Sequence, residues 1–423
     1  MTSAQPANPN TLWGKWCSIP LYLRILVGLV LGIGVGVALG ERAHFLELPA
    51  QIILRLLGAL APPLIMTAVI HVLMTTKIEG KQSARLAFLL ILNTTVAILI
   101  GLAVANIVKP GAGADMKPDG EVKKVNLEDK SPVDLVVANI PRSLLGPLGD
   151  NQNIIGVIII AIALGVALRG VTAHALALQI VEISYESLLT ILNWIIQLVP
   201  IGVFAIVAKV VGTQGFSSFI AMGWFIFAVL LALFLQTCWY MIRIRLFSWP
   251  RIGDIFRGMR DALVMAFSTS SSTVTMPLTY QCLRDKVGVR EKSASLGALV
   301  GANFNNDGTA LYEAMAAMFV AQLVGQNLST WEQVLVVLTS IVASVGAAGI
   351  PEAGLVTMTL VFTAVGLPVE YIALLLAVDW FLDRCRTVIN VLGDVNVSCL
   401  LDGRTREVVS ESDPVASVSV EPA

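Results

Sequence analysis

Charged residues are scarce in this sequence. Only 13% of its 423 residues are Asp, Glu, Lys or Arg, whereas soluble domains contain about 25%. The five cysteines are scattered without CxxC spacing, so no zinc site or disulfide framework is indicated. The formal net charge is −1, and no strongly basic segment suggests nucleic-acid binding. Because 56% of the residues are apolar, the composition indicates a polytopic membrane protein.

Histidine is also rare, and its shortage bears on catalysis. The segment STSSST, at 268–273, contains serines of the kind that act as nucleophiles, but a Ser–His pair needs a histidine close by. The three histidines, His44, His71 and His174, lie outside the C-terminal half. A Ser–Lys pair is the alternative, but the nearest lysines, Lys286 and Lys292, lie in a predicted cytoplasmic turn. We expect neither an enzyme nor a bound cofactor.

Long apolar stretches make up most of the first 250 residues. A membrane-spanning helix needs about 20 mostly apolar residues. The candidate spans are 21–40, 49–74, 86–108, 152–168, 185–211 and 218–242. The first of them mimics a signal peptide, but we interpret it as a span because many other apolar runs follow. A long polar insert separates two of the spans, at 109–150.

The distribution of Lys and Arg predicts the orientation. The loop at 74–85 and the segment 284–292 are rich in Lys and Arg, whereas 324–330 contains neither. Positively charged loops stay in the cytoplasm. We therefore expect a cytoplasmic N-terminus, 1–20, and a cytoplasmic tail, 402–423.

The C-terminal half departs from simple spans. Two apolar segments, about 257–285 and 331–367, are interrupted by the small-residue stretches STSSSTVTMP and SVGAAGIPEAG, which is typical of re-entrant hairpins. A longer helix follows each hairpin, and the first, about 293–323, is interrupted by GANFNNDGTA. Inverted repeats with broken helices are typical of secondary transporters. The predicted fold is all-α, with eight transmembrane helices and two re-entrant helical hairpins in inverted repeats.

The segment DWFLDRCRTVINVLGDV, at 379–395, places charges in the last apolar helix. At 100° per residue its polar side chains fall within a stripe of about 100°, whereas Arg384 lies outside it. The stripe consists of Asp379, Asp383, Arg386, Thr387, Asn390 and Asp394. A charge at mid-bilayer costs about 2.5–3.5 kcal/mol, so the stripe is expected to face the protein interior or a water-filled cavity.

The mixed signs of this stripe suggest a ligand. An Arg binds a carboxylate, an Asp binds an ammonium, and a further Asp binds a cation, so an acidic amino acid with a coupling cation would satisfy all three. The alternative is a set of ion pairs that lock helices together without any ligand. Asp379 has no assigned role.

These motifs resemble the dicarboxylate/amino acid:cation symporter family, which includes excitatory amino-acid transporters and archaeal aspartate transporters. The matching stretches are AFSTSSSTVTMPLT, NNDGTALYEAMAAMFVAQ, SVGAAGIPEAGLVTM, VGLP and VDWFLDRCRTVINVLGD. The similarity is close over about 255–400 and weaker upstream, where PPLIMTAVIHVLM also matches.

The resemblance implies a set of substrate-binding residues. Arg386 would hold the side-chain carboxylate and Asp383 the amino group. The first hairpin tip would contact the α-carboxylate, and the second tip, 348–350, would form the external gate. The full implied set is Ser270, Ser271, Ser272, Thr309, Gly349, Ile350, Asp383, Arg386, Thr387 and Asn390.

The resemblance also implies sodium as the coupling ion, at three sites. The first is made by Gly301, Asn305, Asn390 and Asp394. The second is made by the backbone near Asn303, Ser344, Val345 and Ala347. The third is made by Asn93, Thr94, Asn305 and Asp307. Glu313 matches the proton carrier of proton-coupled members, with a helix carboxylate paired to a neighbouring base as the alternative.

Some positions depart from the family pattern. Asn306 stands where a Met linked to coupling is usual, Asn303 and Asn93 stand where Thr is common, and Leu90 stands where Tyr is expected. Oxygen ligands remain at these sites. We therefore expect coupling to sodium, but the sequence does not fix how many sodium ions move with each substrate. Coupling to protons is the alternative.

The resemblance further implies a homotrimer in the cell membrane, which we expect to be the inner or plasma membrane of a bacterium. Residues 21–254 would be mainly scaffold, and 255–400 would form a core that carries substrate across in an elevator-like motion. The expected activity is import of glutamate or aspartate, and no nucleic-acid partner is expected. The rival functions are a C4-dicarboxylate:cation symporter and an anion channel or sensor of the same fold.

Overall fold

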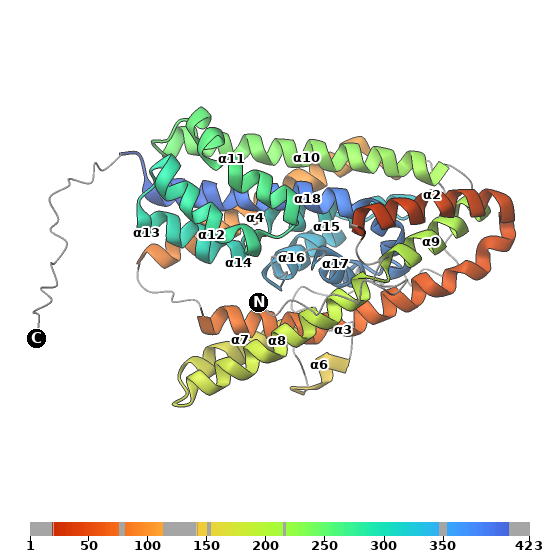
Figure 1. The fold of residues 1–423 in the computed structure, drawn as a ribbon, viewed down its shortest axis with the longest axis horizontal. Helices are drawn as coiled ribbons and strands as arrows, with labels where there is room; N and C mark the ends of the chain where they lie inside the picture. The colour runs from red at the N-terminus through yellow and green to blue at the C-terminus, as the bar shows by residue number, and fades with distance from the viewer. Residues whose placement is uncertain are drawn as a thin grey trace, which may run out of the picture.

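The computed structural model describes residues 19, 21–75, 81–112, 141, 143–149, 154–214, 217–346 and 353–405. Helices account for most of these residues, and no β-strand occurs among them (Figure 1). The all-helical class predicted from the sequence is therefore confirmed.

The N-terminal helices follow the predicted apolar stretches closely. Their bounds are α2 Leu21–Leu39, η1 Gly40–Leu46, α3 Glu47–Thr75, α4 Lys81–Val108, α6 Gly146–Gly149, α7 Ile154–Arg169, α8 His174–Ile196, α9 Val199–Gln214 and α10 Ser217–Phe247. Within the described ranges, four helical segments are long and apolar enough to cross a membrane. They are Leu23–Leu46, Ala84–Val108, His174–Ile196 and Ile220–Phe247.

One predicted span is wrong in its extent. The stretch 185–211 is not a single helix, because α8 begins earlier, at His174, and ends at Ile196, and α9 starts only at Val199. Pro200 lies in the first turn of α9 and has no N–H to continue the hydrogen-bond ladder of α8. Apolar composition runs across the break, so hydropathy alone could not detect it.

The C-terminal half contains two pairs of consecutive helices that pack against each other. The first pair is α11 (Ile252–Thr269) with α12 (Ser272–Gln281), and the second is α16 (Thr330–Gly346) with α17 (Ala353–Ala364). The backbone of Ser270, at the first turn, is left-handed with φ 52°. Both pairs occupy the predicted hairpin segments, and the second tip lies outside the described residues.

A broken helix connects the two pairs. Its pieces are α13 Glu291–Ala294, the π-helix η3 Ser295–Val300, α14 Gly301–Phe304 and α15 Asp307–Leu323, whereas the π-helix η2 Cys282–Val287 continues α12 without a break. The interruption predicted from GANFNNDGTA falls at Asn305 and Asn306, which have non-helical backbone angles. Non-helical backbone at membrane depth is tolerated only inside protein or beside a cavity.

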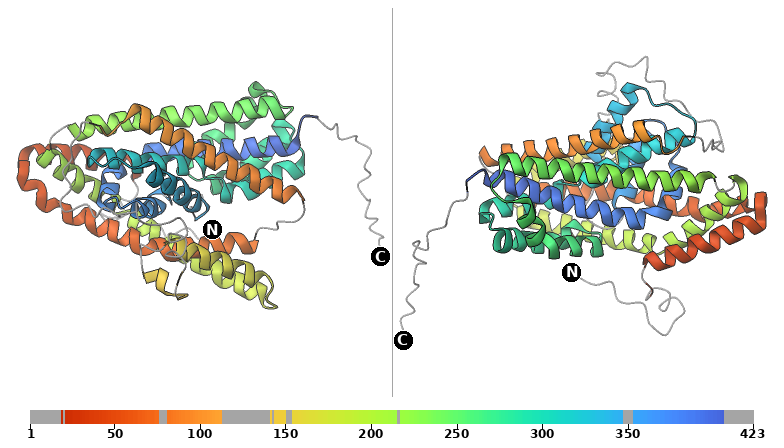
Figure 2. Two further views of the ribbon diagram at one scale, coloured as in Figure 1. Left: turned by 180° about the vertical axis from the view of Figure 1, so that it is seen from behind. Right: turned by 90° about the horizontal axis from the view of Figure 1, so that it is seen from above.

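The last helix organises the C-terminal half. After the short η4 (Val369–Tyr371), α18 runs from Ile372 to Asp402, about 46 Å at 1.5 Å per residue. It packs against α10, α11 and α15, and most of its residues are buried. Figures 1 and 2 show α18 in blue, alongside α10 and surrounded by the C-terminal helices.

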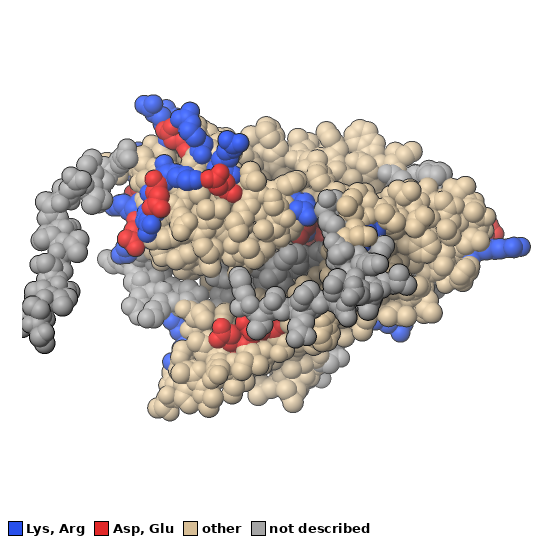
Figure 3. Space-filling view, viewed as in Figure 1, with Lys and Arg blue, Asp and Glu red and all other residues tan. Residues whose placement is uncertain are grey.

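The helices form two packed groups. One group joins α2, α3, α7, α8 and α9, and the other joins α4 and α10 to the C-terminal helices. Two helices from the first 254 residues therefore pack with the C-terminal half. In Figure 3 the Lys and Arg side chains gather mainly at the end of the molecule formed by α11–α13, and most of the remaining visible surface is uncharged.

Three glycines allow α2 to approach α9 unusually closely. Gly28, Gly32 and Gly36 are spaced by four residues, and a Cβ at each would lie 2.6, 2.7 and 2.6 Å from a backbone carbonyl oxygen of α9. The three carbonyls belong to Pro200, Phe204 and Ala208. Small residues at this spacing let backbones meet in membranes, where lipid provides little hydrophobic driving force between helices.

We expect Gly32→Ala to lower the free energy of unfolding by about 1–3 kcal/mol, because its methyl group would overlap the Phe204 carbonyl. Gly34→Ala is the matched control, since no atom lies within 4 Å of a Cβ at that position. Thermal unfolding of the purified protein in detergent measures both variants. Equal melting temperatures would contradict the close α2–α9 contact.

Candidate functional site

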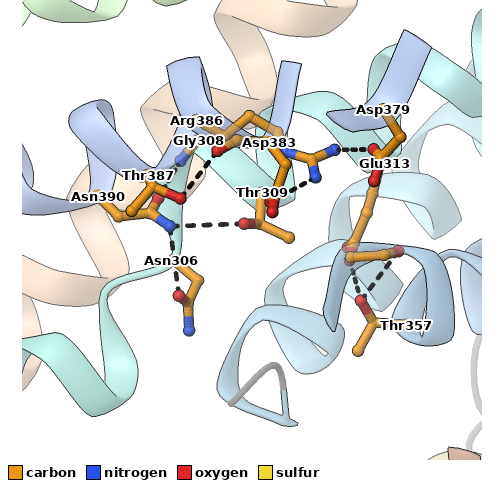
Figure 4. A network of polar contacts seen from close by, with 11 residues as sticks. Asn306, Gly308, Thr309, Glu313, Thr357, Asp379, Asp383, Arg386, Thr387 and Asn390 are labelled. Atoms are coloured by element: carbon orange, nitrogen blue, oxygen red, sulfur yellow. Dashed lines mark hydrogen bonds and ion pairs between the residues drawn. The ribbon is translucent and has the colours of Figure 1, made fainter. Parts of the chain in front are cut away.

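Arg386, near the middle of α18, is the centre of the candidate site. Its side chain is fully buried, with 0% exposure. Nη1 donates to Asp379 Oδ1 at 2.8 Å and Nη2 donates to Asp383 Oδ1 at 2.7 Å. The guanidinium carbon lies 4.0 Å from the centroid of the Tyr312 ring, in a cation–π contact. Figure 4 shows the guanidinium pointing between the two carboxylates.

This cluster joins one guanidinium to two carboxyl groups. Asp379, which the sequence left without a role, is one of the two ion-pair partners of Arg386. Within the part of the chain that the structure describes, Nε of Arg386 has no hydrogen-bond partner although it is buried. An orphaned guanidinium donor and a surplus carboxylate are the groups that a zwitterionic ligand would satisfy.

The first hairpin packs against α18, and Ser270, Ser271 and Ser272 lie at its turn. Ser271 caps α12, because its hydroxyl accepts a hydrogen bond from the Val274 N–H at 3.2 Å. The buried hydroxyl of Ser272 has no partner among the described atoms. Arg384 donates to the carbonyls of Phe267 and Ser268, at 2.8 and 2.7 Å, and so attaches the end of α11 to α18.

The broken helix brings further predicted residues to α18. Asn390 Oδ1 accepts the Gly308 N–H at 2.8 Å, and its Nδ2 lies 3.4 Å from Asn306 Oδ1 and 3.5 Å from Thr309 Oγ1. The Thr387 hydroxyl donates to the Asp383 carbonyl at 2.8 Å. Figure 4 shows these polar groups alongside Arg386 and Asp383.

The second hairpin approaches the same point. A Cβ at Gly354, near the start of α17, would lie 3.1 Å from Thr309 Cγ2 and 3.5 Å from Arg386 Nη2. The predicted gate residues Gly349 and Ile350 lie outside the described residues. The backbone of α17 therefore reaches the guanidinium immediately after this tip.

The first predicted sodium site is a cluster of buried oxygen atoms. Asn305 Nδ2 donates to Asp394 Oδ1 at 3.0 Å and to the Asn390 carbonyl at 3.1 Å. Its Oδ1 is buried and has no partner within the described residues. The backbone of Gly301 is close to the carboxylate, since a Cβ there would lie 2.8 Å from Asp394 Oδ1. The donor set of carboxylate, amide and carbonyl oxygens fits a hard cation.

The second predicted sodium site is only partly described. Asn306 Nδ2 donates a hydrogen bond to the Ser344 carbonyl at 3.0 Å. This carbonyl is one of the oxygens that the resemblance assigns to the second sodium ion. Asn303 lies in α14 and Val345 in α16, and Ala347 is outside the described residues. The departure from Met at position 306 therefore has a direct structural consequence.

The third predicted site contains an unexpected cation. Asp307 accepts hydrogen bonds from the Thr94 hydroxyl at 2.6 Å and from the Tyr240 hydroxyl. Asn93 Oδ1 accepts a hydrogen bond from Arg243 of α10. The sequence analysis assigned no role to Tyr240 or Arg243.

Glu313 is buried one turn after Thr309 on α15. The Thr357 hydroxyl of α17 donates to its Oε1, and Oε2 has no partner in the described part of the chain. Figure 4 shows this contact linking α15 to the second hairpin. The partner of the Glu313 carboxyl group is therefore the Thr357 hydroxyl. The alternative role for Glu313, a carboxylate paired with a basic residue, would require a basic partner instead.

Paired helices and a broken helix that converge on buried charges are typical of membrane transporters. The protein is a transporter rather than an enzyme, because it matches a family of symporters. More particularly, the chain belongs to the sodium:dicarboxylate symporter family, whose pattern matches residues 21–404. The resemblance inferred from the motifs is therefore confirmed. The protein is a multi-pass membrane protein, in agreement with its apolar helices.

Curated relatives align over most of the chain. An excitatory amino acid transporter of Caenorhabditis elegans is 32% identical over 415 residues, covering 84% of this chain and 80% of that protein. Excitatory amino acid transporter 4 of Mus musculus is 30% identical, covering 86% of this chain and 79% of its own length. Excitatory amino acid transporter 3 of Mus musculus is 28% identical, covering 97% and 89%.

Sequence reasoning missed several residues of the site. Tyr312 and Thr357 contribute contacts that depend on how α15 and α17 pack, although Tyr312 follows Thr309 by three residues and shares its helix face. The sequence placed Asp379 on the correct polar stripe but gave it no role. Its position seven residues before Arg386, two helical turns away on the same face, could have indicated that the two residues pair.

We expect Asp379→Asn to lower the free energy of unfolding by about 1–3 kcal/mol, because Arg386 would lose one of two buried carboxylate partners. Thermal unfolding in detergent tests this expectation. Asp285→Asn is the control, since Asp285 pairs with Arg284 on the exposed turn after α12, where that guanidinium holds the pKa of the carboxyl below its usual value. Equal effects of both variants would show that Asp379 does not hold Arg386.

Proposed function

We propose that this protein imports glutamate or aspartate by symport with a cation, with sodium as the principal coupling ion. The observation that carries the proposal is the buried cluster on α18. Arg386 retains an unpartnered Nε within the described structure, and two carboxylates surround it. The names of the aligned relatives, excitatory amino acid transporters, support an amino-acid substrate.

Each polar group of an acidic amino acid has a counterpart in the site. The side-chain carboxylate of the substrate binds the guanidinium of Arg386. The ammonium binds the carboxylate of Asp383, which is three residues away on the same stripe. The α-carboxylate meets the buried hydroxyl of Ser272 at the start of α12, where helix N–H groups also favour an anion.

Asn390 links the substrate cluster to the cation cluster. Its side chain contacts Gly308 and Thr309 near Arg386, and its carbonyl accepts a hydrogen bond from Asn305, which also binds Asp394. Substrate and cation therefore order the same residue, so each raises the affinity for the other. Glu313 is the candidate carrier if a proton also moves.

The architecture in this proposal has eight spans and two re-entrant hairpins. In this count the proposal treats α8 and α9, which replace the predicted span 185–211, as one interrupted span. The packing supports placing α4 and α10 with the moving core, while α2, α3, α7, α8 and α9 form the scaffold of an elevator-like carrier. Assembly as a homotrimer and location in a bacterial plasma or inner membrane remain predictions.

Asp383 argues against the nearest rival function. A C4-dicarboxylate has no ammonium group, so a carrier for succinate would give the carboxylate of Asp383 no role in binding the substrate. An anion channel needs no cation cluster that shares Asn390 with the substrate site. Both rivals are separated from the proposal by transport measurements.

Uptake of labelled aspartate, glutamate and succinate into liposomes that contain the purified protein tests the proposal. We expect sodium-driven uptake of the two amino acids and little uptake of succinate. Arg386→Cys is expected to abolish acidic-substrate uptake, because the carboxylate loses its partner, while some binding of a neutral amino acid such as serine persists. Unchanged aspartate uptake by this variant, or preferential succinate uptake by the unmodified protein, would contradict the proposal.

Asp394→Asn is expected to raise the sodium concentration needed for half-maximal uptake by tenfold or more, which corresponds to about 1.4 kcal/mol, because the cation cluster loses its charged oxygen. The measurement is the sodium dependence of uptake at fixed substrate. A sodium curve identical to that of the unmodified protein would exclude a cation site at Asp394.

A further inference from the structure

Two buried aspartates near the break of the broken helix have different surroundings. Asp394 receives an amide hydrogen bond from Asn305, and no Lys or Arg contacts it among the described residues. Asp307 receives two hydroxyl hydrogen bonds, and an arginine acts on it electrostatically. A nearby positive charge stabilises a buried carboxylate, and among the described residues an arginine acts on Asp307 but not on Asp394.

The arginine near Asp307 belongs to α10. Arg243 is only 6% exposed, and its guanidinium lies 5.6 Å from the centroid of the Trp239 ring. Nη1 donates to the side-chain oxygen of Asn93 on α4. The Arg243 and Asp307 charges attract each other without forming a direct ion pair among the described contacts.

One face of α10 is built around this pocket. Gln236, Tyr240 and Arg243 are spaced by four and three residues, so their side chains lie on the same side of the helix. Gln236 Nε2 lies 3.5 Å from the Asn93 carbonyl, and Tyr240 donates to Asp307. All three are buried polar residues in a helix that is otherwise apolar enough to cross a membrane.

The hydrogen bonds in this cluster occupy part of the lone pairs that an ion would use. Both carboxylate oxygens of Asp307 accept hydroxyl hydrogens, and the side-chain oxygen of Asn93 accepts a guanidinium hydrogen. A sodium ion would have to share these oxygens with the present donors and sit close to a fixed positive charge. Two positive charges in a buried site repel each other strongly, because little water screens them.

We propose that Arg243 is a tethered cation for Asp307, so that the pocket formed by Asn93, Thr94 and Asp307 carries its own positive charge and takes up no sodium ion. The inference rests on the proposed symport function, and it restricts that function by removing the third sodium site implied by the sequence. The Asp394 cluster then provides the principal site for the coupling cation. The carrier therefore moves one sodium ion fewer per substrate than a protein in which this pocket binds the ion.

Arg243→Met removes the tethered charge and leaves Asp307 to attract an ion. We expect the variant to gain one sodium ion per transported substrate, measured in liposomes as the substrate gradient that balances an imposed sodium gradient. We also expect sodium, but not choline, to raise its melting temperature more than that of the unmodified protein. Arg243→Lys keeps the charge and should retain the original ratio, and Arg245→Met is the control for an exposed arginine on the same helix.

An unchanged coupling ratio in Arg243→Met, together with no additional stabilisation by sodium, would overturn the inference. If that variant does not fold, Asp307→Asn provides the test. Slower uptake by Asp307→Asn with an unchanged number of sodium ions per substrate supports the tethered cation. A loss of one sodium ion per substrate would show that Asp307 binds sodium and would overturn the inference. Absence of sodium-driven uptake in the unmodified protein would instead contradict the proposed function, so the two failures are distinguishable.

Discussion

The burial of the Arg386 guanidinium is the constraint on which the rest of the C-terminal half depends. A full positive charge at membrane depth must be matched by nearby groups, and here Asp379, Asp383 and the Tyr312 ring surround it. The broken helix can approach α18 at this point because Gly308 has no side chain, since a Cβ there would lie 2.6 Å from the Arg386 carbonyl. The end of α11 is attached to α18 at Arg384, and the start of α17 lies beside Arg386.

The interruption at Asn305 and Asn306 follows from the same constraint. Two amide side chains at the break contact α18 and α16, so the irregular backbone is surrounded by protein rather than lipid. Asn390 on α18 contacts both asparagines, directly through its own side chain and carbonyl. One helix thereby holds the substrate cluster, the break and the Asp394 cluster in a fixed relation.

Much of this arrangement could be predicted from residues that are close in sequence. The polar stripe of α18, the two helical pairs and the broken helix all follow from local spacing and composition, and each is present. The prediction of one helix over 185–211 is wrong, because apolar composition continues across the break before Pro200. The gate residues Gly349 and Ile350 and the sodium ligand Ala347 stay predictions, since they lie outside the described residues.

The sequence by itself determined which residues of α18 share a face, because a helix repeats every 3.6 residues whatever surrounds it. It also determined that the chain crosses a membrane, because its composition leaves too little charge for a soluble surface. Only the tertiary structure decided the partners of the buried charges. Arg243 and Asn93 are 150 residues apart, and their contact exists because α10 and α4 pack together. Pairing between distant segments depends on helix packing, which no local pattern records.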